Sequence, residues 1–240
     1  MTSCDAAVAS WTIDAVLVGR AQAFTRPGSR SAIDKRPQAG RLRIGLEGLE
    51  LDEQGDRRVH GGPDKALHHY PRDHYPAWRD ELGAHALLDA PGAFGENLSS
   101  CGVTEADLCL GDRLRLGTAM VEVSQSRQPC WKLSDRFGVA ALARRVQDSG
   151  RTGWYYRVLQ PGEVGAGDRL TLLERPYPQW SLARLVGLLY RREIDPAQLQ
   201  QVLALPLVPN WRTLFERRLA QRAVEDWDKR LLGQAPEEGR

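Results

Sequence analysis

Short apolar runs separated by glycine, proline and aspartate extend from Ile13 to about Arg175, and this pattern constrains the fold more than any other feature of the chain. Short runs bounded by turn residues are typical of β-strands, and several in succession predict a barrel or a sandwich. The runs are Ile13–Val18, Leu108–Leu116, Met120–Val123, Trp154–Leu159 and Leu170–Leu173. Between two of them, residues 116–119 (Leu-Gly-Thr-Ala) predict a tight hairpin.

Two helices are expected to interrupt the strands, over Arg72–Leu82 and Leu133–Gln147. In the second, Ser134 or Asp135 is a suitable N-cap, and Gly150 lies just past the expected end. The β region is therefore expected to carry helical inserts.

The pattern changes after Glu174, where the sequence Arg-Pro-Tyr-Pro-Gln indicates a linker. Three helices are expected beyond it, and Ser181, Asp195 and Asn210 are their predicted N-caps. The expected ranges are Ser181–Arg192, Pro196–Leu203 and Asn210 to about Leu232. The chain is thus predicted to be mainly β with an α appendix: a β-barrel domain over residues 1–175 and a C-terminal three-helix domain over residues 180–232.

The last expected helix carries an approximate apolar stripe at helical spacing. The stripe consists of Leu214, Arg218, Val224, Trp227 and Leu231. Such a stripe serves either as an internal core or as a dimer face, so a homodimer is one expectation.

The near balance of charge argues against broad binding to nucleic acid or membranes. The chain has 33 lysines and arginines against 31 aspartates and glutamates, a formal charge of +2. Residues 1–10 lack the basic and apolar regions of a signal peptide, and the most apolar later stretch, Leu182–Tyr190, is far shorter than the roughly 20 residues of a membrane span. A cytoplasmic protein with no nucleic-acid or membrane partner is expected.

Four of the five histidines lie within residues 60–74. A zinc site is disfavoured there, because His60 and His68 are too far apart for one helical turn and no thiol is near. His60 precedes a Gly-Gly-Pro turn that permits close backbone approach to a ligand, so it is a candidate site residue, while His74 is expected at a helix. Lys65 follows the turn and can meet an anion.

A second motif covers Gly92–Leu98, in which Glu96 and Asn97 follow two small residues around Phe94. Glu96 is a candidate acid–base residue. A solvated glutamate in a turn is the alternative for this motif taken alone.

A third motif, over Ser124–Leu133, places Cys130 after a strand and before a helix, near Arg127, Lys132 and Arg136. Basic neighbours favour the thiolate, which attacks electrophiles and binds soft metals; an inert buried cysteine is the alternative. The other cysteines, Cys4, Cys101 and Cys109, form no Cys-x-x-Cys pair with it, and Cys101 and Cys109 are expected to be structural.

The charge around Cys130 is strongly positive. Residues 113–157 contain nine basic and three acidic side chains, a net +6, which leaves −4 for the remainder of the chain. Arginines grip phosphate in a bidentate way, so this segment suits an anionic ligand; a solvated basic face is the competing interpretation.

Five segments resemble the MOSC family (molybdenum cofactor sulfurase C-terminal type), in its YiiM-like branch. They are Val59–Tyr75, Ala93–Leu98, Val123–Leu133, Gly150–Tyr155 and Trp211–Leu232. One departure is the sequence Leu-Asp-Glu-Gln at residues 51–54, where the family usually shows Gly-Asp before the glutamine; a small loop change is expected. The resemblance implies a MOSC β-barrel followed by three helices, and a molybdenum cofactor enzyme that reduces N-hydroxylated purines and related N-hydroxylamines to amines.

The resemblance also implies residue roles. Cys130 would ligate molybdenum beside the pterin dithiolene, and His60 and Glu96 are hypothesised to deliver protons. The pterin phosphate and its pocket would be held by Lys65, Arg127, Lys132 and Arg151, with Asn97 and Thr152 as neutral hydrogen-bond donors. The sequence shows no flavin, iron–sulfur or dinucleotide-binding motif, so a separate NAD(P)H-dependent flavoprotein reductase is implied as the electron donor.

Two other functions share these motifs. One is a non-catalytic carrier of molybdenum cofactor or sulfur that uses Cys130. The other is a metal-free Cys-His-Glu hydrolase with Cys130 as nucleophile and His60 as base.

Overall fold

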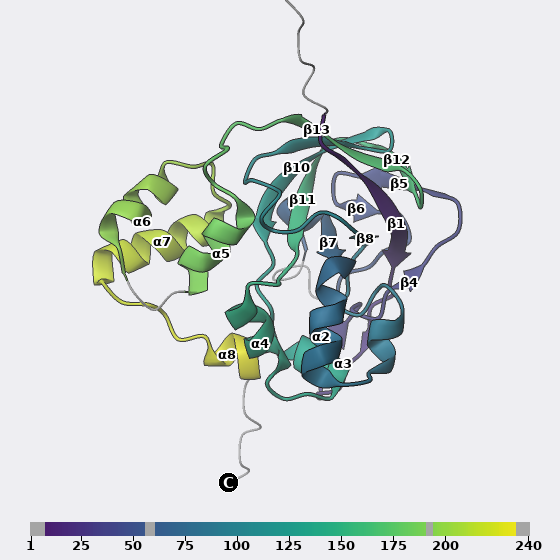
Figure 1. The fold of residues 1–240 in the computed structure, drawn as a ribbon. Helices are drawn as coiled ribbons and strands as arrows, with labels where there is room; N and C mark the ends of the chain where they lie inside the picture. Colours follow the sequence, from purple (N-terminus) through teal and green to yellow (C-terminus); the bar gives the residue numbers. More distant parts are fainter. Residues whose placement is uncertain (1–7, 56–60, 191–193, 234–240) are drawn as a thin grey trace, which may run out of the picture.

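The computed structural model describes residues 8–55, 61–190 and 194–233, which form a β-barrel and a set of C-terminal helices (Figure 1). Within these ranges no helix has the length and apolar character that a bilayer crossing would require.

Seven strands close the barrel. Their order is β13-β9-β10-β11-β7-β8-β1, and β13 also pairs with β1, which closes the ring. All pairs are antiparallel except β7 with β8. The strands are β1 (Ser10–Val18), β7 (Leu67–Pro71), β8 (Leu98–Ser100), β9 (Arg113–Leu116), β10 (Ala119–Ser126), β11 (Trp154–Gln160) and β13 (Arg169–Glu174).

Shorter strands decorate this barrel. β4 (Arg36–Pro37) extends β1; β5 (Arg41–Gly45), β6 (Gly48–Leu49) and β12 (Gly162–Gly165) form a three-stranded sheet; β2 (Gln22–Ala23) pairs with β3 (Arg30–Ser31). The alternation of β9, with Leu114 and Leu116 fully buried and Arg113 and Arg115 exposed, shows how the sequence selects the barrel interior.

The predicted hairpin is confirmed, because Gly117 turns β9 into β10 with a φ of 56°. The strand expected over Leu108–Leu116 is only partly right. Its first half is a turn in which the Asp112 carboxylate accepts a hydrogen bond from the Cys109 amide at 2.9 Å. A side-chain acceptor that serves local backbone competes with a strand ladder, so β9 begins only at Arg113.

The first helical insert is confirmed: a 3₁₀ turn at Arg72–His74 leads into α2 (Tyr75–Leu82). The single helix expected over Leu133–Gln147 is wrong. Two helices occupy this region, α3 (Trp131–Phe137) and α4 (Leu142–Ser149), because Gly138 adopts the left-handed conformation and ends the first. Further 3₁₀ turns lie at Pro63–Lys65 and Ala86–Asp89.

The C-terminal helices are α5 (Leu182–Tyr190), α6 (Pro196–Leu203), α7 (Pro209–Gln221) and α8 (Asp228–Leu232). Asp195 caps α6 as expected, through bonds from the amides of residues 197 and 198. Asn210 is not a cap, because Pro209 already occupies the first turn after Val208.

The continuous helix expected up to Leu232 is wrong as well. Arg222 has a φ of 52° and ends α7, so α8 is a separate helix. The predicted stripe is therefore divided: Leu214 packs with the core of α5–α7, whereas Trp227 and Leu231 pack against Ala143 of α4. These apolar side chains meet partners within the chain, and a homodimer stays a prediction.

Candidate functional site

Cys130 lies where two hollows of the barrel domain meet. One is a cavity of about 100 Å³, and the other is a groove of about 750 Å³ that opens toward the C-terminal helices. The residues that line both are Gly55, Lys65, Gln128, Cys130, Lys132 and Tyr155. Cys130 thus lines both the large groove and the smaller cavity.

The local structure explains the position of Cys130. Strand β10 ends at Ser126, and Pro129 prevents the loop from continuing either as a strand or as a helix. Cys130 is the N-cap of α3, with an extended backbone (φ −133°, ψ 168°), and its side chain is half-buried. The sequence prediction of a cysteine between a strand and a helix is confirmed.

Arg127 supplies a buried positive charge in the cavity wall. Its exposed fraction is 7%, and its Nη1 has no hydrogen-bond partner among the described residues. Its backbone amide donates to the Gly153 carbonyl at 3.0 Å, which anchors the loop to β11. A buried donor left unpaired costs free energy, so this guanidinium is prepared for an acceptor on a ligand.

Two lysines stand beside Cys130. Burial lowers the pKa of Lys65, an effect that negative charge at Cys130 and Asp64 partly offsets. The Lys132 ammonium donates to the Arg30 carbonyl at 2.6 Å, which joins α3 to strand β3. The predicted proximity of Lys65, Arg127 and Lys132 to Cys130 therefore holds in the structure.

His68 is a cavity residue that the sequence interpretation missed. Its Nε2 is buried without a partner among the described residues, and burial, reinforced by the Arg127 charge, holds its pKa well below the ordinary value. His69 points into the barrel, where its ring nitrogens contact Tyr156 and Ser100 at 3.0 and 2.8 Å. Neighbouring residues of a strand face opposite sides, and this alternation is the signal that could have found His68.

A buried ion pair between Lys35 and Asp52 was also missed. Lys35 is 8% exposed, and its ammonium contacts the Asp52 carboxylate in the cavity wall. Asp52 further accepts from the Gly19 amide at 2.7 Å. The preceding residue, Leu51, has a φ of 67°, the left-handed region that favours the glycine usual in the family. The expected small loop change is thus a strained residue next to a cavity residue.

Asn97 lines the cavity but is fully occupied by the fold. Its Oδ1 accepts from the His68 amide at 3.1 Å, and its Nδ2 donates to the Leu17 carbonyl at 3.2 Å and to Asp52 at 2.9 Å. Its amide therefore ties β7, β1 and the Asp52 loop together, and its effect on a ligand is indirect.

Glu96 has a structural position in place of the catalytic one that the sequence predicted. It is completely buried and does not line the Cys130 cavity. Its carboxylate accepts hydrogen bonds from the amides of Gly92 (2.6 Å) and Phe94 (3.0 Å) and from the Tyr75 hydroxyl (2.9 Å). Burial raises its pKa, and these donors partly offset the effect. The carboxylate holds the loop over residues 92–96.

Arg151 and Thr152 are also displaced from the predicted site. Arg151 forms an ion pair with Glu81, stacks 3.7 Å from the Trp78 ring centroid and lines a different hollow. Thr152 is fully buried, and its hydroxyl donates to the Gly153 carbonyl at 3.0 Å. The backbone link between this segment and Arg127 is the hydrogen bond to the Gly153 carbonyl, and neither Arg151 nor Thr152 lines the cavity. His60 lies outside the described residues.

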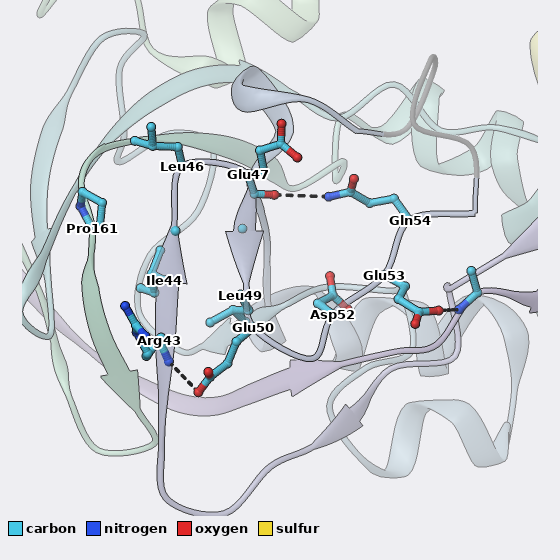
Figure 2. Close-up of a pocket in the computed structure, with 13 residues that line it drawn as sticks. Arg43, Ile44, Leu46, Glu47, Leu49, Glu50, Asp52, Glu53, Gln54 and Pro161 are labelled. Atoms are coloured by element: carbon cyan, nitrogen blue, oxygen red, sulfur yellow. Dashed lines mark hydrogen bonds between the residues drawn. The ribbon is translucent and has the colours of Figure 1, made fainter.

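A second groove, of about 850 Å³, adjoins the cavity on the other side of residues 52–54 (Figure 2). Figure 2 shows the Gln54 side chain donating to the Glu47 carbonyl (3.3 Å) and the Arg43 amide donating to Glu50 (3.0 Å). Glu53 accepts from the Ala21 amide at 2.8 Å and pairs with Arg20. The segment from Asp52 to Gln54 is therefore a fixed partition between the two hollows.

The described residues contain no group of three or more histidine, cysteine, aspartate and glutamate side chains that could hold a metal ion. A single thiol with cationic neighbours suits a metal already chelated by an anionic organic ligand.

Comparisons with known proteins agree with this architecture. Residues 56–171 match the MOSC domain, and residues 180–222 match the YiiM-like, 3-alpha helix domain. The chain is 40% identical to Protein YiiM of Escherichia coli (strain K12) over 91% of this chain and 97% of that protein. It is 36% identical to a protein named Reductase from Gibberella moniliformis, over 79% of this chain and 34% of that one.

Solved structures show the same fold. The crystal structure of YiiM from Escherichia coli matches with a TM-score of 0.79 and 32% identity, covering 94% of this chain and all (100%) of that one. YiiM from Geobacillus stearothermophilus matches with a TM-score of 0.74 and 34% identity, covering 88% of this chain and 100% of that one. With its barrel and C-terminal helices both matched, the chain belongs to the MOSC family, in the branch that carries the YiiM-like helical domain.

Proposed function

We propose that this protein is a molybdenum cofactor-dependent reductase that converts N-hydroxylated purines and related N-hydroxylamines to amines, with Cys130 as the protein ligand to molybdenum. The observation that carries the proposal is the half-buried Cys130 thiol on a cavity whose wall holds the Arg127 guanidinium, with its Nη1 unpaired among the described residues, in a chain of the MOSC family. The fungal relative named Reductase supports the reaction class.

The residues at the site fit the cofactor that the family implies. Cys130 offers a soft sulfur ligand, and Arg127, Lys65 and Lys132 offer positive charge for the anionic parts of the pterin. The groove of about 750 Å³ lies within the range of roughly 300–1,000 Å³ that is usual for ligand sites. We assign cofactor binding to Arg127, Lys65 and Lys132 and not to Arg151 or Thr152, which do not line either hollow at Cys130.

Reduction of an N-hydroxylamine to an amine consumes two electrons and two protons and releases water. When bound, the molybdenum cofactor supplies the electrons at the N–O bond, and we propose a separate NAD(P)H-dependent flavoprotein reductase as their source. Protons must be held by the chain itself. Lys65 is the ammonium proposed for this task, since it lines both hollows at Cys130 and its lowered pKa makes it a better proton donor than an exposed lysine.

The decisive experiment is molybdenum analysis of protein made in a host that produces the cofactor, combined with an N-hydroxylaminopurine reduction assay that contains NADH and a flavoprotein reductase. One molybdenum per chain and turnover of the base are expected. Stoichiometric molybdenum without turnover would favour the cofactor carrier. Absence of molybdenum would overturn the proposal, although the Cys-His-Glu hydrolase would still lack its carboxylate, because Glu96 is outside the cavity.

Arg127→Ala is expected to lower the molybdenum content of purified protein roughly tenfold, because a charge-assisted hydrogen bond to the bound anion is lost. The fold loses the hydrogen bond between Arg127 and Tyr155, while Nη1 of Arg127 has no partner among the described residues, so the melting temperature is expected to fall by less than about 4 °C. Elemental analysis and calorimetry measure the two effects.

The matched control is Arg113→Ala, which removes an exposed arginine of the same basic segment that pairs with Glu122 and Glu174. It should keep the molybdenum content of the wild type. Equal molybdenum content in Arg127→Ala and wild type would remove Arg127 from the cofactor site.

A further inference from the structure

Helix α8 leaves the other C-terminal helices and returns to the barrel domain. After α7 ends at Arg222, the chain crosses to α4, and Figure 1 shows α8 beside α4 and apart from α5–α7. Trp227 and Leu231 anchor it by packing against Ala143 of α4. The match to the three-helix domain ends at residue 222, so α8 lies beyond that domain.

Arg230 of α8 binds the loop that carries Cys130. One guanidinium nitrogen, Nη1, donates to the Pro129 carbonyl, and the other, Nη2, donates to Oε1 of Gln147 at 2.5 Å. The guanidinium also lies 5.9 Å from the ring centroid of Tyr190. The Arg230 guanidinium therefore connects the Cys130 loop, α4 and α5, and its contact with the loop is to the carbonyl of the Pro129–Cys130 peptide.

A second arginine secures the other neighbour of Cys130. The Arg26 guanidinium lies 4.0 Å from the Trp131 ring centroid, and its Nη1 donates to the Leu232 carbonyl at the end of α8 at 2.8 Å. Arg26 also binds both carboxylate oxygens of Asp135 in α3, at 3.1 and 3.2 Å. Both residues that flank Cys130 are thus held by arginines that connect to α8.

We propose that α8 is a positioning element of the Cys130 site, and that Arg230 is the positioning residue that fixes the Pro129–Cys130 peptide and hence the direction of the thiol. A charge-assisted bond to the Pro129 carbonyl restrains the backbone on one side of Cys130, and this sets the direction of the Cα–Cβ bond from which the thiol extends. Asn210, Asp226, Lys229 and Arg230 also line the groove at Cys130, so the C-terminal helices complete one wall of the site.

The contacts of Arg230 involve residues of this chain alone, and their consequence for molybdenum rests on the proposed function. The test compares Arg230→Met, which keeps the stem of the side chain, with Arg230→Lys, which keeps the charge. The control is Arg144→Ala, which removes the 2.7 Å ion pair to Asp228 and so breaks another α4–α8 contact without touching the Cys130 loop.

The first measurement uses cofactor-free protein. The rate of Cys130 alkylation by iodoacetamide is followed by peptide mass spectrometry, with the exposed Cys101 as internal reference. Arg230→Met is expected to raise the alkylation rate at Cys130 roughly tenfold, because the loop loses one charge-assisted bond. It is also expected to speed amide hydrogen exchange over residues 130–137. Arg230→Lys should recover part of both effects, and Arg144→Ala should match the wild type.

The second measurement is molybdenum retention by loaded protein, which Arg230→Met should reduce and Arg144→Ala should not. Unchanged Cys130 alkylation and exchange in Arg230→Met would overturn the inference. Equal changes in Arg230→Met and Arg144→Ala would also overturn it, because general loosening of α8 would then explain both. If the wild type retains no molybdenum, the proposed function fails, while the alkylation experiment still decides the role of Arg230.

Discussion

Cys130→Ser is expected to abolish molybdenum retention and N-hydroxylaminopurine reduction while the protein stays folded. A serine hydroxyl is a poor ligand for a soft metal, and changes that only surround a metal site already cost 10- to 100-fold, so loss of the ligand itself should leave less than roughly 1% of wild-type activity. The fold should survive, because residue 130 is the N-cap of α3, where serine is a preferred residue.

The measurements are elemental analysis, visible absorption of the metal centre, turnover, and circular dichroism with thermal melting. Cys101→Ser serves as the control, since Cys101 is exposed and lines neither hollow at Cys130. Cys101→Ser should behave as wild type in every assay. Turnover by Cys130→Ser at the wild-type rate would exclude molybdenum ligation by this residue as the basis of the activity.

The β-barrel could be predicted because its signals are local. In β9, buried Leu114 and Leu116 alternate with exposed Arg113 and Arg115, and this pattern can be recognised in four consecutive residues. Gly117 marks the turn that follows, because glycine readily adopts a positive φ. The end of α7 has no such signal. No glycine or proline stands near Arg222, whose left-handed backbone ends the helix, so no residue type in the sequence marks this position.

The site could be predicted only in part for a related reason. Cys130, Arg127 and Lys132 come together because they share one short loop and the start of one helix. A sequence does not show whether a polar side chain is already occupied within the fold. The carboxylate oxygens of Glu96 accept hydrogen bonds from three donors in its own loop and in α2, so they are already occupied within the fold.

Residues that join distant parts of the chain were missed altogether. Arg230 and Pro129 are separated by 101 positions, and the contact depends on where α8 docks. Lys35 and Asp52 meet because two loops fold over the same cavity. Such pairs are products of the tertiary structure, and no spacing rule in a single sequence predicts them.

The stability of the protein is expected to fall steeply as the pH drops below neutrality, and His69 is a principal cause. Burial lowers the pKa of His69 from 6.5 to about 3 in the folded state. In the unfolded chain His69 therefore takes up a proton near pH 6.5, whereas in the folded chain it does so only near pH 3. The free energy of unfolding consequently decreases as the pH falls between these values. The loss from His69 is about 2 kcal/mol by pH 5 and up to about 5 kcal/mol at the lower end.

Urea unfolding followed by tryptophan fluorescence at pH 7.5, 6 and 5 measures this effect. His69→Gln should be less stable at pH 7.5, because the contacts to Tyr156 and Ser100 are altered, but its free energy of unfolding should fall less between pH 7.5 and 5 by about 2 kcal/mol. Glu96 acts in the opposite direction, since its raised pKa adds stability as the pH falls, so only the comparison of variants isolates His69. If the free energy of unfolding of His69→Gln fell with pH as steeply as that of the wild type, the imidazole would take up its proton within the folded barrel. The rings of Trp154 and Tyr156 around His69 oppose such protonation.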